Sequence, residues 1–152
     1  MRRGGTIAAA GLACALAAGL VAPVGAVEFR SIATAAAVLY DGPSVKSRRL
    51  YVAPRGMPVE IVSTADPLWI KARDVGGDVF WVARTDLGEV RSVITAAPAN
   101  VRQAASDTAP VVFRAERGVL LEPVELAAGG WVRVRHRDGA SGYVRTSEIW
   151  GL

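Results

Sequence analysis

The sequence predicts an all-β protein in which two tandem small β-barrels follow a cleaved signal peptide. Two observations on the chain beyond residue 26 support this fold class. The chain repeats itself, and its apolar residues fall in short runs that are typical of strands, with no helical stripe of about ten residues. The repeat is the stronger observation, because it defines the folding unit before any function is considered.

Residues 1–26 have the features of a secretory signal peptide. Arg2 and Arg3 give a charged start, residues 6–22 form an uncharged apolar run, and residues 24–26 are small. We expect cleavage after residue 26, export to the periplasm and no stable membrane insertion of the mature chain. A retained anchor is the alternative, but a run of about 17 residues is at the short limit for a membrane span.

The composition argues against several classes of function. Removing the leader takes away two of the 18 basic residues and no acid, which leaves 16 bases against 14 acids. Both signs are mixed along the chain, whereas nucleic-acid-binding domains usually cluster their cations. The single cysteine, Cys14, lies in the leader, so the mature chain has neither a disulfide nor thiol chemistry. We therefore expect no nucleic-acid partner.

The repeat is clearest in its C-terminal half. Residues 67–87 align without a gap with residues 129–149 at a shift of 62, so that Trp69 matches Trp131. Two turn glycines, Gly56 and Gly77, recur at the same shift as Gly118 and Gly139, and several apolar positions recur with them. One structural unit has therefore been used twice.

The N-terminal parts of the two copies match at a shift of 61. EFRSIATAA at residues 28–36 aligns with EVRSVITAA at residues 89–97. This match sets the boundary between the copies. We predict one module at residues 27–88 and a second at residues 89–152.

About five short strands are expected in each module. The first module has three runs rich in β-branched and aromatic residues, at residues 59–62, 69–73 and 79–82. In the second, residues 131–135 alternate between apolar and charged, and Asp138-Gly139 then predicts a hairpin because its turn needs a positive φ. A short 3₁₀ turn is expected at residues 148–150. Short strands of this number predict a small closed barrel.

The order of these motifs resembles the bacterial SH3 (SH3b) family. The resemblance depends on Asn100-Val101-Arg102, Gly118, Trp131, Val134, Gly139, Gly142-Tyr143-Val144 and Ile149. The first module departs from the pattern in two places: Tyr40 stands where the family has Arg, and Phe80 stands where it usually has Gly. The resemblance covers nearly all of the mature chain and implies SH3-like barrels.

The resemblance also implies a binding module without catalytic activity. Some relatives hold peptidoglycan peptides in a groove lined by aromatic residues, which suits an extended peptide. We therefore expect binding to cell-wall peptidoglycan or its peptides. The alternative is a protein-interaction or scaffolding role in the periplasm. An exposed aromatic groove would favour the first function, and a flat apolar patch across both modules would favour the second.

Five aromatic residues are candidates for such a groove: Tyr40, Trp69, Trp81, Trp131 and Tyr143. Trp69 and Trp131 occupy a repeated strand position, and large rings often fill the interior of a small barrel, so a mainly structural role is favoured for both. Tyr40 lies beside an Asp-Gly-Pro turn, and its exposure stays open.

Arginines of the second module are candidates for binding anionic groups. Arg133, Arg135 and Arg137 are expected to share one face of a strand. Such a stripe could attract acidic peptides or phosphates, with Arg133 and Arg135 as the candidate residues. The solvated face of a half-buried sheet is the more common reason for such a stripe, and we favour it.

Catalysis, metal binding and cofactors are not expected. His136 is the only histidine and is expected to be an exposed residue at a strand end. It has neither the companions of a catalytic triad nor those of a metal site. Glu122 and Glu125 could form a carboxylate pair, but Pro123 is expected to break their strand and both are better explained as surface residues.

Overall fold

The computed structural model describes residues 26–152. The predicted signal peptide lies outside the described residues, apart from its last residue. Within the described part of the chain, no helix is long and apolar enough to span a bilayer.

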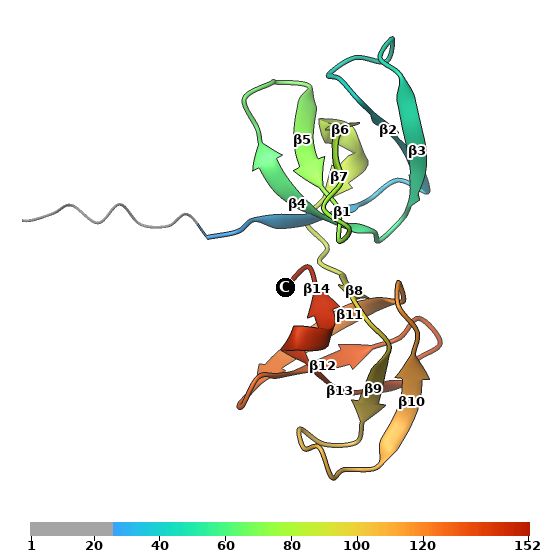
Figure 1. Ribbon diagram of the computed structural model, residues 1–152, viewed down its shortest axis with the longest axis vertical. Coiled ribbons are helices and arrows are strands. Elements are labelled where there is room, and N and C mark those ends of the chain that lie inside the picture. The colour runs from blue at the N-terminus through green and yellow to red at the C-terminus, as the bar shows by residue number, and fades with distance from the viewer. Residues whose placement is uncertain (1–25) are drawn as a thin grey trace, which may run out of the picture.

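The described chain folds into two seven-stranded antiparallel sheets, which confirms the predicted all-β tandem fold (Figure 1). The strands of the first module are β1 Phe29–Ile32, β2 Ala36–Tyr40, β3 Arg49–Pro54, β4 Pro58–Ser63, β5 Trp69–Arg73, β6 Val79–Ala83 and β7 Leu87–Gly88. The strands of the second are β8 Val93–Thr95, β9 Ala99–Arg102, β10 Val111–Ala115, β11 Leu120–Ala127, β12 Trp131–Arg135, β13 Ser141–Arg145 and β14 Ile149–Trp150.

The two sheets have the same topology. The strand order is β3-β2-β6-β5-β4-β1-β7 in the first and β10-β9-β13-β12-β11-β8-β14 in the second, so each strand matches the one seven places later. A single 3₁₀ turn precedes the last strand of each module, η1 at Arg84–Asp86 and η2 at Thr146–Glu148. The expected turn near residues 148–150 therefore lies slightly earlier in the chain.

Each sheet curls on itself (Figure 1), and each module has its own cluster of buried apolar residues. The core side chains come from alternate positions of the strands, as expected when one face of a sheet is buried. The first core includes Leu39, Ile70, Phe80 and Val82. The second includes Val101, Leu121, Val132 and Val144.

Two expectations about the strands of the second module are wrong. β12 ends at Arg135, and Arg137 lies in the following turn, so Arg137 does not share the strand face of Arg133. Pro123 does not break β11, because the strand continues past it through a β-bulge between Pro123 and Glu125. A bulge is one of the few places where a sheet tolerates proline.

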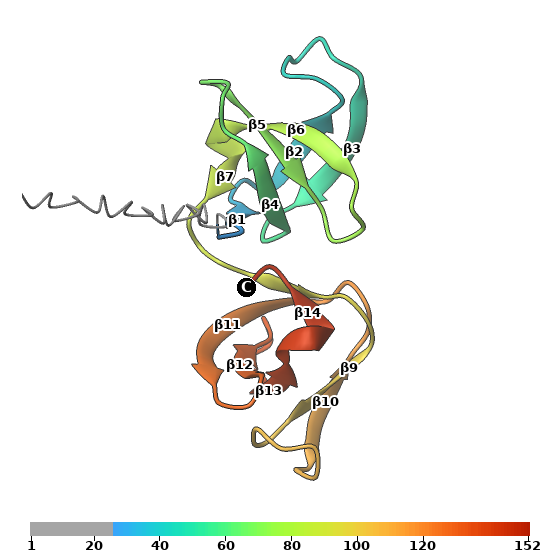
Figure 2. The ribbon, with the colours of Figure 1, turned by 60° about the vertical axis from the view of Figure 1, so that its left-hand side comes forward.

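The two modules pack against each other, with β1 and the start of β4 on one side and Ser92, β14 and the C-terminus on the other. Figure 2 shows β1 and β4 facing β14 and the C-terminus across the junction. The rings of Phe29 and Trp150 meet edge-on with centroids 4.8 Å apart. The hydroxyls of Ser31 and Ser92, which are equivalent residues of the repeat, lie 2.8 Å apart. The junction therefore combines an aromatic pair with a buried polar contact.

Gly151 is the tightest point of this junction and gives a testable prediction. A Cβ at this position would lie 2.9 Å from Pro58 Cβ and 3.0 Å from the carbonyl oxygen of Ser92, and the backbone φ is +106°. Gly139 has a similar φ of +95° but open space around it. Gly151→Ala should therefore lower the free energy of unfolding by about 2 kcal/mol more than Gly139→Ala, because only the former adds a steric clash to the backbone strain. Urea unfolding of both variants measures this difference, and equal losses would show that Gly151 is not a packing constraint.

Candidate functional site

Each module presents a row of polar and aromatic side chains on the outer face of three neighbouring strands. In β5, Ile70 and Ala72 belong to the core, so Trp69 and Lys71 lie on the opposite face. The same alternation places the corresponding residues of β12 outside. We call these surfaces the module 1 platform (Tyr40, Trp69, Lys71 and Trp81) and the module 2 platform (Arg102, Trp131, Arg133 and Tyr143).

Strand register brings the platform residues side by side. In module 1, Tyr40 pairs with Trp81, which in turn pairs with Lys71. In module 2, Arg102 pairs with Tyr143, which pairs with Arg133. Directly paired residues on one face lie within contact distance. The same three neighbouring positions are therefore Tyr40, Trp81 and Lys71 in module 1. In module 2 they are Arg102, Tyr143 and Arg133.

The two repeated tryptophans are buried but stand apart from the core clusters. Trp69 is 9% exposed and Trp131 is 5% exposed, and neither belongs to the cluster of its module. Both lie at the end of the platform and are covered there by neighbouring side chains. Burial agrees with a structural role, while the outer location keeps these rings next to the exposed part of the platform.

In module 1 the cover is aromatic. Tyr40 is 8% exposed, which settles the question left open by the sequence, and its ring meets Trp69 edge-on at 5.4 Å. Trp81 is half-buried, and Lys71 Nζ lies 6.0 Å from the centre of its ring. That separation permits a weak cation–π attraction. The open part of this platform is therefore the Trp81 ring with one cation beside it.

The entry to β5 is fixed by polar contacts that hold Trp69 in place. The Asp66 carboxylate accepts hydrogen bonds from the backbone N–H groups of Leu68 and Trp69, at 2.8 and 2.9 Å. The Arg84 guanidinium donates to three carbonyl oxygens of the same loop, those of Thr64, Asp66 and Pro67. These hydrogen bonds hold the loop that borders the module 1 platform next to Trp69.

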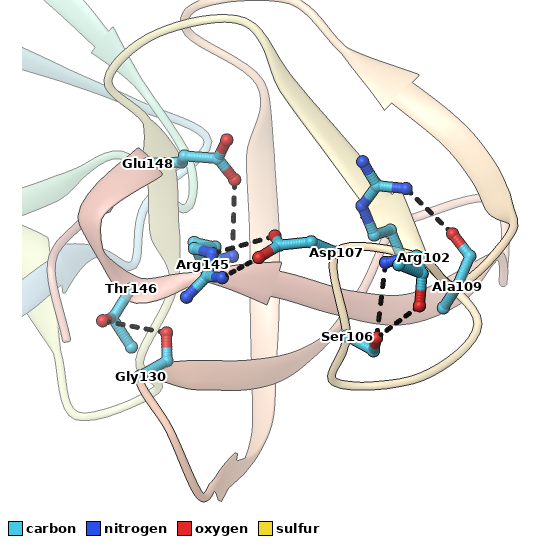
Figure 3. Close-up of polar contacts among 9 residues, drawn as sticks. Arg102, Ser106, Asp107, Ala109, Gly130, Arg145, Thr146 and Glu148 are labelled. Carbon is cyan, nitrogen blue, oxygen red and sulfur yellow. Dashed lines mark hydrogen bonds and ion pairs between the residues drawn. The ribbon is translucent and has the colours of Figure 1, made fainter.

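In module 2 the cover is an ion pair (Figure 3). The guanidinium of Arg145 lies 4.5 Å from the centre of the Trp131 ring, and it also binds the Asp107 carboxylate through two nitrogens. Asp107 comes from the loop between β9 and β10. The hydrogen bond from Arg145 holds the pKa of Asp107 below its usual 3.8. Trp131 is thus covered by the Arg145–Asp107 ion pair, whereas Trp69 is covered by the ring of Tyr40.

This cover should respond to acid. The pKa of Asp107 is lower in the folded chain than in the unfolded one, so the ion pair adds stability above the unfolded pKa and loses it as pH falls through the folded pKa. We expect the indole N–H resonance of Trp131 to shift in that acidic range as Arg145 is released. An NMR titration measures the shift. If the Asp107→Asn variant shows the same transition, the ion pair is not its cause.

The two candidate arginines are exposed and ion-paired. Arg133 Nη1 lies 3.9 Å from Glu125 and Arg135 Nη2 lies 2.8 Å from Glu122, with each arginine side chain about half exposed. Exposed pairs of this kind contribute little to stability. Arg133 belongs to the platform beside Tyr143. Arg135 lies two residues further along the chain and is the last residue of β12 before the hairpin turn.

The sequence reading did not identify Arg145 and Asp107. A signal for Arg145 was available, because the predicted hairpin at Asp138-Gly139 sets the pairing of β12 with β13 and places Arg145 opposite Trp131. Asp107 lies in an irregular loop, and no strand pattern places such a residue. Its contact with the platform is visible only in the structure.

His136 is half-buried rather than exposed, since it lies at the base of the hairpin turn. Its Nδ1 is 3.0 Å from Asp138 and its ring faces Phe113, with centroids 6.0 Å apart. The pKa of Asp138 is lowered mainly by a hydrogen bond from the backbone N–H of Ala140, and next by a hydrogen bond with the His136 side chain. Among residues 26–152, no group of three or more His, Cys, Asp or Glu residues is arranged to hold a metal ion.

Comparisons with known proteins give one family. A family model described as "Bacterial SH3 domain" matches the chain twice, at residues 33–89 and 95–151. A comparison with curated proteins gives no match. Among solved structures, NlpC2 from Trichomonas vaginalis has 15% identity and a TM-score of 0.38, with 84% of this chain and 49% of that chain covered. NlpC1 from the same organism has 16% identity and a TM-score of 0.38, with 86% and 48% covered. The chain spans about half the length of each of these two proteins.

Proposed function

The chain belongs to the bacterial SH3 domain family, with two domains in tandem, and on this premise we propose that it binds cell-wall peptidoglycan through the peptides of that polymer. The proposal places the protein in the periplasm and gives it no catalytic role. Bacterial SH3 domains are often carried by exported or cell-wall proteins, which supports this proposal.

The observation that carries the proposal is the pair of outer platforms. Trp81 and Tyr143 occupy the same position in the two modules, and both are half-buried, so each ring keeps an accessible face. Each ring has a cation as its strand neighbour, Lys71 in module 1 and Arg133 in module 2. A flat aromatic surface can bury the apolar atoms of an extended peptide while the cation pairs with a carboxylate.

The module 2 platform is the more cationic of the two. Arg102 and Arg133 flank Tyr143, whereas Tyr40 and Lys71 flank Trp81. Arg102 is partly engaged, since its Nη1 donates to the carbonyl oxygen of Ala109 at 2.8 Å. We infer that the two modules bind different segments of peptide, with acidic groups directed to module 2. Two linked weak sites raise the overall affinity when both can engage one polymer.

Co-sedimentation with intact sacculi tests the proposal. The purified protein should pellet with sacculi in about 0.5 M salt, a level that screens exposed charge pairs. Trp81→Ala and Tyr143→Ala should each weaken the affinity for sacculi by up to about tenfold, because an aromatic contact contributes about 0.5–1.5 kcal/mol beyond the area that it buries. Circular dichroism should show that both variants stay folded.

Leu126→Ala is the matched control. Leu126 is a large apolar residue of β11 that is 74% exposed and lies off both platforms. It should leave the bound fraction unchanged. Wild-type protein that stays in the supernatant, or an equal loss with Leu126→Ala, would contradict a wall-binding platform.

A second candidate function, docking on an envelope protein, is favoured by the edge strands. β3 and β10 end their sheets, and they expose Leu50, Tyr51 and Val52 on β3 and Val111 and Val112 on β10. An apolar sheet edge is a common place for strand addition by a partner. If sacculi fail to bind while Val52→Lys abolishes capture of one periplasmic protein, this second function replaces the first.

A further inference from the structure

A cleft lies between the two modules, away from both platforms. Two adjacent cavities, of about 580 and 530 Å³, form this inter-module cleft. Their shared lining residues are Arg55, Gly56, Ser92, Glu122 and Arg137. The first module supplies Arg55 and Gly56, and the second supplies the rest. The cleft therefore exists only because the modules pack together.

The charge of the cleft is strongly positive. Its lining contains four arginines, which are Arg55, Arg91, Arg135 and Arg137, and one acid, Glu122. The Arg135 guanidinium already holds the Glu122 carboxylate, at 2.8–3.1 Å. Among residues 26–152, the ion pairs include neither Arg55, Arg91 nor Arg137. Three cations thus face the cleft without an acidic partner in the described chain.

The walls of the cleft are apolar. Pro54, Val119 and Leu120 line one cavity, and Ile32 and Val90 line the other. Apolar walls favour a ligand with aliphatic groups to bury, and uncompensated arginines favour carboxylates, which they bind in a bidentate geometry. We propose that the inter-module cleft binds an acidic peptide, with Arg55 and Arg137 pairing with its carboxylates and the apolar walls covering its aliphatic side chains.

A phosphate polymer fits this cleft less well. It would satisfy the arginines but would leave the apolar walls without a partner. The site is separate from the platforms, so it can be present whether or not the platforms bind peptidoglycan. Arg91 lines only one of the two cavities, and its Nη2 donates to the carbonyl oxygen of Gly151 at 3.5 Å. Arg55 and Arg137, which line both cavities, are therefore the residues to test.

Fluorescence anisotropy with a labelled acetyl-Leu-Glu-Leu-Glu-amide peptide tests the proposal. The purified protein should bind this peptide, and the double variant R55Q/R137Q should bind it at least about tenfold more weakly, through the loss of two charge-assisted hydrogen bonds. The matched double variant R49Q/R114Q removes the same charge from β3 and β10, outside the cleft, and should bind like the wild type. A peptide with Gln in place of Glu should bind more weakly.

Several results would overturn the proposal. Equal affinity in R55Q/R137Q, or an equal loss in R49Q/R114Q, would show that the cleft is not the site. Equal binding of the Gln peptide would show that the arginines do not recognise carboxylates. Binding of inorganic pyrophosphate without any binding of the Glu peptide would assign the cleft to phosphates. Sacculus binding by R55Q/R137Q, measured in parallel, separates these outcomes from a failure of the platforms.

Discussion

Gly142→Ala is expected to lower the free energy of unfolding by about 3 kcal/mol, because the position has no room for a methyl group. A Cβ there would lie 2.5 Å from the carbonyl oxygen of Arg102 and 2.8 Å from Val101 Cγ1. The oxygen belongs to the backbone of the neighbouring strand β9, so the clash can be relieved only by moving that strand. Unlike the turn glycines, Gly142 is required by a close approach rather than by its φ.

Urea unfolding measures this loss, and Gly76→Ala provides the control. Gly76 also lacks a positive φ, but its Cβ would meet only the Asp74 carboxylate, at 3.2 Å. This side chain can move, so the control should change the stability by less than about 1 kcal/mol. Similar losses in the two variants would mean that β9 and β13 adjust without cost, which would contradict the packing described for module 2.

Phe80→Ala is expected to lower the stability by about 4 kcal/mol, the usual cost of removing a buried phenyl ring. Phe80 is the first module's counterpart of Gly142 and is only 1% exposed. Its ring packs in the core and meets Tyr51 edge-on at 5.9 Å. The same barrel position is therefore filled by the largest core side chain in one module and must stay empty in the other.

The control for this variant is Val79→Ala, on the same strand but 48% exposed. It should cost less than about 1 kcal/mol. Unfolding curves followed by tryptophan fluorescence and by circular dichroism give both values. A loss of about 1 kcal/mol or less in Phe80→Ala would mean that the first core can collapse around the gap, contrary to its close packing.

The second module carries an aromatic ring against its core on a different strand, β10 instead of β6. Phe113, the counterpart of Tyr51, packs against the core of module 2, whereas Tyr51 is pushed outwards and donates a hydrogen bond to Asp74 at 2.8 Å. The pKa of Tyr51 is raised above its ordinary value, mainly by burial of the hydroxyl and next by its hydrogen bond to the Asp74 carboxylate. Each core therefore receives a phenyl ring, but from a different strand in each module.

Most of the fold could be predicted from the sequence, because its signals are an internal repeat and short residue patterns within the strands and turns. The repeat identified two equal modules, and the alternation in Trp131–Arg135 with the Asp138-Gly139 turn identified a hairpin that the structure contains. The prediction of a strand break at Pro123 was wrong because proline is unfavourable inside a strand except at a bulge. The bulge is seen only in the pairing of β11 with β12. The junction between the modules depends on contacts such as Phe29 with Trp150, which no local pattern encodes.

The candidate site could be predicted less well, for a physical reason. The sequence shows an aromatic residue at a repeated strand position, but it does not show whether that residue lies on the core face or on the outer face of the strand. Val132 and Val134 fill the core, which leaves the outer face to Trp131. The Trp131 ring is covered by Arg145 of the neighbouring strand, and Arg145 is held by Asp107 of the β9–β10 loop. Loop conformation and side-chain rotamers determine such contacts, and the sequence does not specify them locally.

An NMR titration of the indole N–H groups with soluble muropeptides, released from sacculi, tests the platforms most directly. The chain contains four tryptophans, three of which belong to the platforms: Trp69, Trp81 and Trp131. Trp150 lies against Phe29, outside both platforms and outside the residues that line the inter-module cleft, and serves as an internal control. We predict that the Trp81 resonance shifts most, that those of Trp69 and Trp131 shift less because these rings are covered, and that the Trp150 resonance stays in place. Resonances that all remain fixed at saturating muropeptide, or a shift confined to Trp150, would contradict the assignment of the platforms as the peptide-binding surface.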